Sequence, residues 1–297
     1  MLIRTNVVTI GDPFVINCGD CYYMYATGFD FNGFVVRKSQ DLQNWENLGP
    51  CLDLNDSWAF QDFWAPEVIY RNGKYIMHYS ARRKSDKSLR IGVAVSNTPQ
   101  GPFVDCYNGP MFDFGYAAID GHVFIDDDNT PYFYYSKDCS ENVVNGVHES
   151  HLFVVKLNDD LTKVVSEPVF VFAPSKPHER LFKGNTQWNE GPYMLKKDGK
   201  YYLTYSANCY ATKEYCVCLA VSNSPVSGFV KADEPILSYK DCESDFSGPG
   251  HNAFFKDNEG NLKMAFHIHT NENAPSHDRK AVICDAEIIN DTIKFKL

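Results

Sequence analysis

Five stretches of the sequence resemble one another, because each leads from a polar or proline-containing start into an apolar run. They read GDPFVI from residue 11, WAPEVI from 64, IDGHVFI from 119, NEGPYML from 189 and PGHNAFF from 249. Aligned on this pattern, they place the following residues at one position: Asp12, Ala65, Asp120, Glu190 and His251. Three of these are carboxylic acids and one is a histidine, and both types serve as proton donors and acceptors in enzymes.

Carboxylic acids that face one another across a pocket can hydrolyse a glycosidic bond. One stays protonated and donates to the leaving oxygen, while an ionised one activates water or attacks the anomeric carbon. A third carboxylate nearby raises the pKa of the acid, because like charges oppose ionisation. The same side chains can also ligate a cation, so a metal site is the alternative that the residues leave open. Any single Asp or Glu is usually a solvated surface residue, but recurrence at one repeat position favours a shared function.

A repeated set of strands must position these residues. Each of the five stretches is followed by a turn and an aromatic-rich segment: CGDCYYMYA (18–26), NGKYIMHYS (72–80), DNTPYFYYS (128–136), DGKYYLTYS (198–206) and EGNLKMAFH (259–267). A third strand-like segment follows in each unit. Five units of about four antiparallel strands predict an all-β fold, a five-bladed β-propeller that forms a single domain over residues 1–297, rather than a β-sandwich. Inner strands are expected to start near 12, 65, 120, 190 and 251.

In a propeller the innermost strand of every blade runs along a central channel. The first residues of the five inner strands therefore meet at one mouth of that channel. We expect Asp12, Asp120, Glu190 and His251 to face one cavity there, with Trp64 as an aromatic wall.

Composition excludes several classes of protein. The 297 residues carry a formal net charge of −10, which argues against a nucleic-acid partner. The sequence contains no apolar run of 18 residues, so it predicts no membrane-spanning helix. The ten cysteines include no paired CxxC motifs, so small buried side chains in a reducing compartment are favoured over a zinc site. The first residues lack the features of a signal peptide, and we expect a cytoplasmic protein.

Six ordered motifs resemble glycoside hydrolase family 43. They are GDPFVI, FWAPEV, IDGHVFIDDDNTPYFYYS, NEGPYMLKKDGKYYLTYSA, GPGHNAFF and HIHTNENAPSHDRKAVI, and the resemblance covers about residues 8 to 290. These are five-bladed propellers that include α-L-arabinofuranosidases, β-xylosidases and arabinanases. The resemblance implies that Asp12 is the general base, Glu190 the general acid and Asp120 the carboxylate that tunes and orients the acid. It also implies an inverting mechanism, with a carboxyl separation of roughly 6.5–9.5 Å.

The resemblance implies further contacts to the substrate. His251 matches a channel histidine that lies near a bound calcium or other cation, often through water, although no cofactor is required. Arg279 matches an arginine that reaches a sugar hydroxyl with its planar donors. Trp64 matches a pocket wall for the apolar face of a pentose, and Phe31 and Ile119 are further candidates for the pocket, with plain core packing as the alternative.

Two more histidines, His267 and His269, stand two residues apart on one expected strand and should face the same side. We expect hydrogen-bonded core positions for both, rather than a direct catalytic role.

Within the family, the sequence favours an exo-acting α-L-arabinofuranosidase on arabinose-containing oligosaccharides. The chain has EGP where endo-arabinanases tend towards EAP, and it contains no segment for the C-terminal β-sandwich of many β-xylosidases. A β-xylosidase is the next alternative, then an endo-1,5-α-L-arabinanase. From other classes, we keep a catalytically silent carbohydrate-binding propeller and a retaining fructosidase. The oligomeric state is not predicted.

Overall fold

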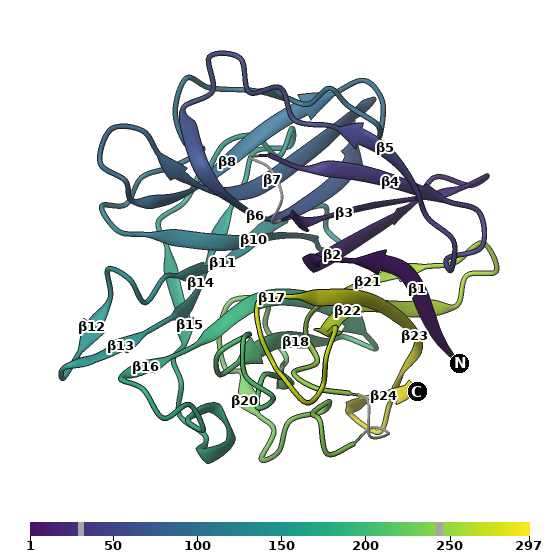
Figure 1. The fold of residues 1–297 in the computed structure, drawn as a ribbon. Helices are drawn as coiled ribbons and strands as arrows, with labels where there is room; N and C mark the ends of the chain where they lie inside the picture. Colours follow the sequence, from purple (N-terminus) through teal and green to yellow (C-terminus); the bar gives the residue numbers. More distant parts are fainter. Residues whose placement is uncertain (29–32, 242–245) are drawn as a thin grey trace.

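Five antiparallel sheets surround a central axis in the computed structural model, which describes residues 1–28, 33–241 and 246–297 (Figure 1). The first sheet consists of β2 (Ile10–Asn17), β3 (Tyr22–Gly28), β4 (Val35–Ser39) and β5 (Glu46–Pro50). The second consists of β6 (Ala59–Arg71), β7 (Lys74–Arg83), β8 (Leu89–Ser96) and β9 (Val104–Asp105). The third consists of β10 (Ala118–Ile125), β11 (Pro131–Lys137), β14 (His151–Lys156) and β15 (Val169–Phe172). The fold is the predicted five-bladed β-propeller.

The fourth and fifth blades complete the ring. The fourth consists of β17 (Asn189–Lys197), β18 (Lys200–Ala207), β19 (Cys216–Ser222) and β20 (Val230–Lys231). The fifth consists of β21 (Gly250–Lys256), β22 (Leu262–His269), β23 (Arg279–Ile289), β1 (Leu2–Val8) and β24 (Thr292–Lys296). Outside the blades lie a small sheet, of β12 (Val143–Val144), β13 (Val147–Glu149) and β16 (Thr186–Gln187), and the 3₁₀ helix η1 (Pro177–Glu179). The inner strands start close to the predicted positions, except that β6 begins six residues earlier, at Ala59.

The N-terminal strand closes the propeller. β1 pairs antiparallel with β23, so that residues from both ends of the chain share the last blade. The terminal amine of Met1 forms an ion pair with Asp285 at 2.6 Å, and the hydroxyl of Thr5 donates to the carbonyl of Ala281 at 2.7 Å. Because β1 continues directly into β2 of the first blade, its hydrogen bonds to β23 join the first blade to the last.

The hydrophobic core of the described residues consists of six clusters, and the five larger ones each fill the space between two neighbouring blades. Side chains alternate between the two faces of a strand, so the second strand of a blade contributes to two clusters. In β3, Tyr23 and Tyr25 pack towards the second blade, while Tyr22 and Met24 pack towards the fifth. This double burial explains why the aromatic-rich segments read as continuous apolar runs.

Nine cysteines lie within the described residues, and five of them are buried, in keeping with the expectation of small buried side chains. Within the described ranges, no helix is long and apolar enough to cross a membrane.

Candidate active site

A β-bulge interrupts every inner strand where the strand enters the channel. The register shifts between the first and second strand of each blade at this point. One residue of each bulge has a positive φ, between 44° and 58°: Asp12, Ala65, Asp120, Gly191 and His251. Asp, His and Gly tolerate the left-handed region better than most residues, which accounts for four of the five residue types.

This backbone position corrects the alignment drawn from the sequence. Gly191, not Glu190, is the counterpart of Asp12 and Asp120, and Glu190 lies one residue earlier, at the position of Trp64. The alignment matched acidic side chains, whereas the repeat is defined by the left-handed residue. The third carboxylic acid therefore enters the cavity from a different backbone position than the other two.

Side chains from the neighbouring blade hold four of the five bulges. The amide of Asp120 donates to the hydroxyl of Ser80 at 2.9 Å, and the amide of His251 donates to that of Ser206 at 2.8 Å. Thr27 accepts in the same way from Ala65, and Nδ1 of His267 accepts from Asp12. Each acceptor lies near the end of the second strand of the preceding blade. This role explains the Thr, Ser or His that ends the aromatic-rich strands.

The fourth blade departs from this pattern. The amide of Gly191 donates to Oδ2 of Asp120 at 3.0 Å, and Ser136 instead donates to the carbonyl of Asn189 at 2.9 Å. The bulge next to Glu190 is thus tied directly to the second carboxylate, so that Asp120 and the backbone that carries Glu190 are oriented together.

The predicted residues come together around a cavity of about 250 Å³ at the channel mouth. Seven of the eight candidates line it: Asp12, Trp64, Ile119, Asp120, Glu190, His251 and Arg279. The eighth, Phe31, lies outside the described residues. Asp120 and Glu190 are only 7% and 8% exposed, so the charge on one strongly affects the other.

Asp12 is surrounded by groups that favour its ionised form. Oδ2 accepts from the hydroxyl of Thr27 at 2.5 Å, and Oδ1 accepts from Arg279 at 3.0 Å. Nδ1 of His251 lies 3.3 Å from the same Oδ1. Burial alone would raise the pKa of Asp12, but the positive charges of His251 and Arg279 outweigh it and hold that pKa well below its usual range. Asp12 is therefore a carboxylate at neutral pH, as a general base must be.

Glu190 and Asp120 are shifted the other way. The pKa of Asp120 is raised to about 6, first by burial and then by the charge of Asp12, against the opposing effect of His251. Burial also raises the pKa of Glu190 well above its usual value. The negative charges of Asp120, Asp12 and Asp138 raise this pKa as well, because they oppose ionisation. A carboxyl group that keeps its proton near neutral pH can act as a general acid.

The channel below the carboxylic acids has room for one water molecule or one bare ion. A void of about 10 Å³ there is lined by Asp12, Glu67, His251 and Asn252, among others, and Oδ1 of Asn252 is buried without a hydrogen-bond partner. That oxygen suits a hard cation or a water proton. Within the described ranges, no three His, Cys, Asp or Glu side chains gather closely enough to hold a metal ion. The residues thus fit a bound water better than a protein-ligated cation.

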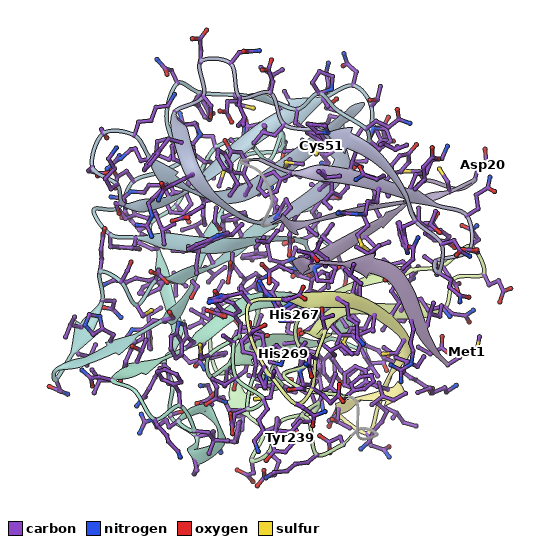
Figure 2. All side chains as sticks on the ribbon, in the orientation of Figure 1. Met1, Asp20, Cys51, Tyr239, His267 and His269 are labelled. Atoms are coloured by element: carbon purple, nitrogen blue, oxygen red, sulfur yellow. The ribbon has the colours of Figure 1, made fainter. Side chains whose placement is uncertain are left out.

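His267 and His269 occupy core positions, as expected (Figure 2). Burial and, after it, the charge of Arg279 together lower the pKa of His267 to about 3, so a neutral ring accepts a hydrogen bond from the amide of Asp12. Nε2–H of His269 donates to the carbonyl of Tyr210 at 2.8 Å. Arg279 lies over the ring of Tyr210, 4.5 Å from its centroid. It also forms an ion pair with Asp12, and its contact with a sugar hydroxyl stays a prediction.

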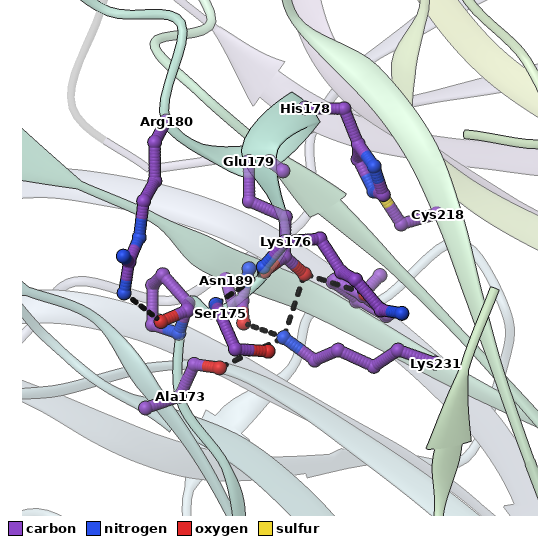
Figure 3. Close-up of polar contacts among 12 residues, drawn as sticks. Ala173, Ser175, Lys176, His178, Glu179, Arg180, Asn189, Cys218 and Lys231 are labelled. Carbon is purple, nitrogen blue, oxygen red and sulfur yellow. Dashed lines mark hydrogen bonds and ion pairs between the residues drawn. The ribbon is translucent and has the colours of Figure 1, made fainter. Parts of the chain in front are cut away.

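A buried ionic network supports the backbone that leads into Glu190 (Figure 3). Nζ of Lys231 contacts Oε1 of Glu179 at 2.6 Å, Oδ1 of Asn189 at 2.8 Å and the carbonyl of Ala173 at 2.8 Å. Glu179 is fully buried, and the Lys231 side chain is only 5% exposed. The network ties η1 and the end of β20 to the residue that directly precedes Glu190.

Sequence reasoning did not single out eight further residues that line the cavity, and four of these have aromatic or acidic side chains: Asp138, Trp188, Tyr210 and Tyr215. Trp188 lies two residues before Glu190, so its proximity could have been inferred. The other three lie in loops or at strand ends away from the inner strands. No signal in the sequence distinguished them from core aromatics or surface acids.

The fold and the site define a glycoside hydrolase built on a propeller. The chain belongs to glycosyl hydrolases family 43, whose sequence model matches residues 5–292. A thermostable family-43 glycoside hydrolase of known structure is 41% identical, with a TM-score of 0.93 over 99% of this chain and 95% of that one. A second solved structure, an endo-1,4-beta-xylanase from Bacteroides thetaiotaomicron, is 33% identical, with a TM-score of 0.84 over 99% of this chain and 97% of that one.

Curated relatives are more distant. A "Xylosidase/arabinosidase" of Bacteroides ovatus is 30% identical over 62% of this chain and 63% of its own length. An "Extracellular exo-alpha-(1->5)-L-arabinofuranosidase" of Streptomyces avermitilis is 23% identical over 94% of this chain and 56% of its own length. The matched part of this chain thus spans less than two thirds of either relative, and these names bear on the class of enzyme rather than on one activity.

Proposed function

We propose that the protein is an inverting, exo-acting α-L-arabinofuranosidase that releases terminal arabinose from arabino- or arabinoxylo-oligosaccharides. The observation that carries this proposal is the size of the cavity around the three carboxylic acids. Its volume of about 250 Å³ lies below the roughly 300–1,000 Å³ of pockets for drug-sized ligands. Such a cavity suits one terminal sugar, whereas an endo-acting enzyme needs a groove that continues on both sides of the cleaved bond.

In the proposed reaction Asp12 and Glu190 act on opposite sides of the sugar. Asp12, held ionised by Arg279 and His251, accepts a proton from the water that attacks the anomeric carbon. Glu190 gives its proton to the leaving oxygen as the glycosidic bond breaks, and the configuration inverts. The charge of Asp120 keeps the proton on Glu190 before this step. A water molecule must fit beside Asp12, so we expect the two carboxyl groups roughly 6.5–9.5 Å apart.

The remaining cavity residues would hold the sugar. Trp64 offers an aromatic face to the apolar side of a pentose, and Ile119 adds an apolar wall. Arg279 reaches a sugar hydroxyl in this proposal while it stays paired with Asp12, because its guanidinium carries five N–H donors. Phe31 stays a predicted pocket residue.

A substrate screen tests the proposal directly. We expect faster hydrolysis of 4-nitrophenyl α-L-arabinofuranoside than of 4-nitrophenyl β-D-xylopyranoside, and arabinose alone as the product from arabino-oligosaccharides. A ladder of shorter oligosaccharides would show an endo-acting enzyme instead. NMR of the first-formed sugar should show the inverted anomer, whereas a retained anomer would refute the assignment of Asp12 as base.

A β-xylosidase is the second candidate, because the Bacteroides ovatus relative is named for both activities. Faster turnover of the xylopyranoside would favour it and leave the roles of the carboxylic acids unchanged. Asp12→Asn should abolish turnover of either substrate, because the water loses its base. Sugar binding without turnover of either substrate by the parent protein would instead identify a binding module.

A further inference from the structure

Tyr215 contacts the carboxyl group of Glu190 and has no part in the mechanism so far. It directly precedes β19, lines the catalytic cavity and is fully buried. Its hydroxyl donates a hydrogen bond to Oε1 of Glu190 at 2.8 Å. A tyrosine hydroxyl in this geometry can reach the carboxyl group before, during and after the transfer of the proton.

The ring of Tyr215 cannot turn away from Glu190. It stacks on the neutral ring of His267, with centroids 5.5 Å apart and an angle of 2° between the planes. On another side it lies against Gly250, where even a Cβ atom would come within 2.2 Å of the Tyr215 ring. The backbone amide of Tyr215 donates to the carbonyl of Thr212 at 3.2 Å. Packing and backbone contacts therefore hold the hydroxyl in place.

This hydrogen bond makes the two oxygens of Glu190 unequal. In a neutral carboxyl group one oxygen carries the proton and the other is the better acceptor. Oε1 accepts from Tyr215, so the proton belongs on Oε2. After the proton has left, the same hydrogen bond stabilises the carboxylate that remains.

We propose that Tyr215 is a positioning residue that keeps the acidic proton of Glu190 on Oε2 and stabilises the carboxylate formed when that proton is transferred. The proposal rests on the proposed function, in which Glu190 is the general acid. The effect of Tyr215 on kcat must be larger for a leaving group that needs protonation. A hydrogen bond to the carboxylate of Glu190 lowers the barrier only when the proton leaves Glu190 in the transition state.

The chain offers a matched control for this test. Tyr205 lies in the same blade and is fully buried as well, and its hydroxyl donates to Oε1 of Glu179 at 2.7 Å. Glu179 is not among the residues that line the catalytic cavity. Tyr215→Phe and Tyr205→Phe thus remove the same kind of hydrogen bond, one at the acid and one away from it.

The experiment compares both variants and Glu190→Ala on an arabino-oligosaccharide, whose leaving group is a poor one, and on the 4-nitrophenyl glycoside, whose leaving group needs little protonation. For Tyr215→Phe we expect kcat to fall about tenfold on the oligosaccharide and less than threefold on the aryl substrate, with KM little changed. The alkaline limb of its pH profile should move to higher pH, because the hydrogen bond from Tyr215 opposes the rise in the pKa of Glu190. Tyr205→Phe should lower the melting temperature but leave the leaving-group ratio and the pH profile unchanged.

Equal losses on both substrates, or an unmoved alkaline limb, would overturn the proposal. If Glu190→Ala shows no larger loss on the oligosaccharide than on the aryl glycoside, the proposed function fails. If Glu190→Ala does show a larger loss on the oligosaccharide but Tyr215→Phe behaves like the parent, only the proposed role of Tyr215 fails. Should Tyr215→Phe not fold, difluorotyrosine placed at this position keeps the shape and donates more strongly. The alkaline limb should then move to lower pH, and an unmoved limb would overturn the proposal.

Discussion

Removal of the buried cation behind the active site should destabilise the protein strongly. In Lys231→Met the ammonium group that contacts Glu179, Asn189 and the carbonyl of Ala173 is replaced by an apolar side chain of similar length. Glu179 is fully buried, so its carboxylate would remain without a counter-charge. The change tests whether the network in Figure 3 stabilises the fold through the pairing of its charges.

The expected magnitude follows from the groups that remain around Glu179. Its Oε1 still accepts from Tyr205 at 2.7 Å, and its Oε2 still accepts from the amides of Ser175 and Lys176 at 2.6 and 2.7 Å. These hydrogen bonds compensate part of the loss, but none of the three donor groups carries a positive charge. Breaking a buried pair in this way costs about 3–5 kcal/mol, and we expect about 3 kcal/mol here, a large part of the roughly 5–15 kcal/mol of a folded domain.

Urea unfolding followed by tryptophan fluorescence measures this loss. Lys200→Met is the control, because Lys200 lies in the same blade as Lys231 and forms a 2.6 Å pair with Asp291 of the fifth blade in which both side chains are exposed, at 41% and 60%. The expected cost of this control is below about 1 kcal/mol. The double variant Lys231→Met with Glu179→Gln should recover most of the loss, because the uncompensated charge is then gone.

The pH dependence gives a second check with a defined sign. Burial raises the pKa of Glu179, but the charge of Lys231 outweighs it, so the folded-state pKa lies below the unfolded one. This contribution to stability is present above the unfolded pKa and is lost as the pH falls through the folded pKa. The cost of Lys231→Met should therefore be largest near pH 7 and smaller near pH 4. A cost below about 1 kcal/mol, or no recovery in the double variant, would refute the reasoning.

Four further predictions concern the catalytic cavity. Asp120→Asn removes a negative charge beside Glu190, so the alkaline limb of the kcat/KM profile should move to lower pH, and an unmoved limb would contradict the assigned coupling. Because burial raises the folded-state pKa of Glu190, its ionisation costs stability as the pH rises through that pKa; the gain in melting temperature of Glu190→Gln should grow from pH 5 to pH 8, whereas a constant gain would argue against a raised pKa. Gly191→Ala places a Cβ 3.2 Å from Nδ1 of His251 at a φ of 54°, so we expect about 1 kcal/mol of destabilisation and a lower kcat on the oligosaccharide; unchanged values of both would show that the bulge relaxes. Dialysis against a chelator should change kcat/KM less than twofold, and a loss restored by calcium would establish a required cation.

The repeat made much of the fold predictable. Five turn signals, each followed by an aromatic strand, mark the blades, because every blade must bury both faces against its neighbours. Asp12, Asp120 and His251 were placed at the channel mouth from the same repeat, and the structure confirms that they line one cavity. The closure of the ring by β1 was not predicted, since pairing between strands almost 280 residues apart leaves no local pattern.

The sequence by itself determined the number of blades, the family and the three carboxylic acids, because these depend on residue types at repeated spacings. Only the tertiary structure decided that Gly191 and not Glu190 occupies the left-handed bulge position, because the backbone angle of one residue is set by its packing across two blades. It also decided which carboxyl group holds the proton. Asp12 meets Arg279 and His251, whereas Glu190 meets Tyr215 and other carboxylates, and those neighbours come from strands and loops far apart in the chain. A pKa depends on the charges and the burial around a group, and both exist only once the blades have come together.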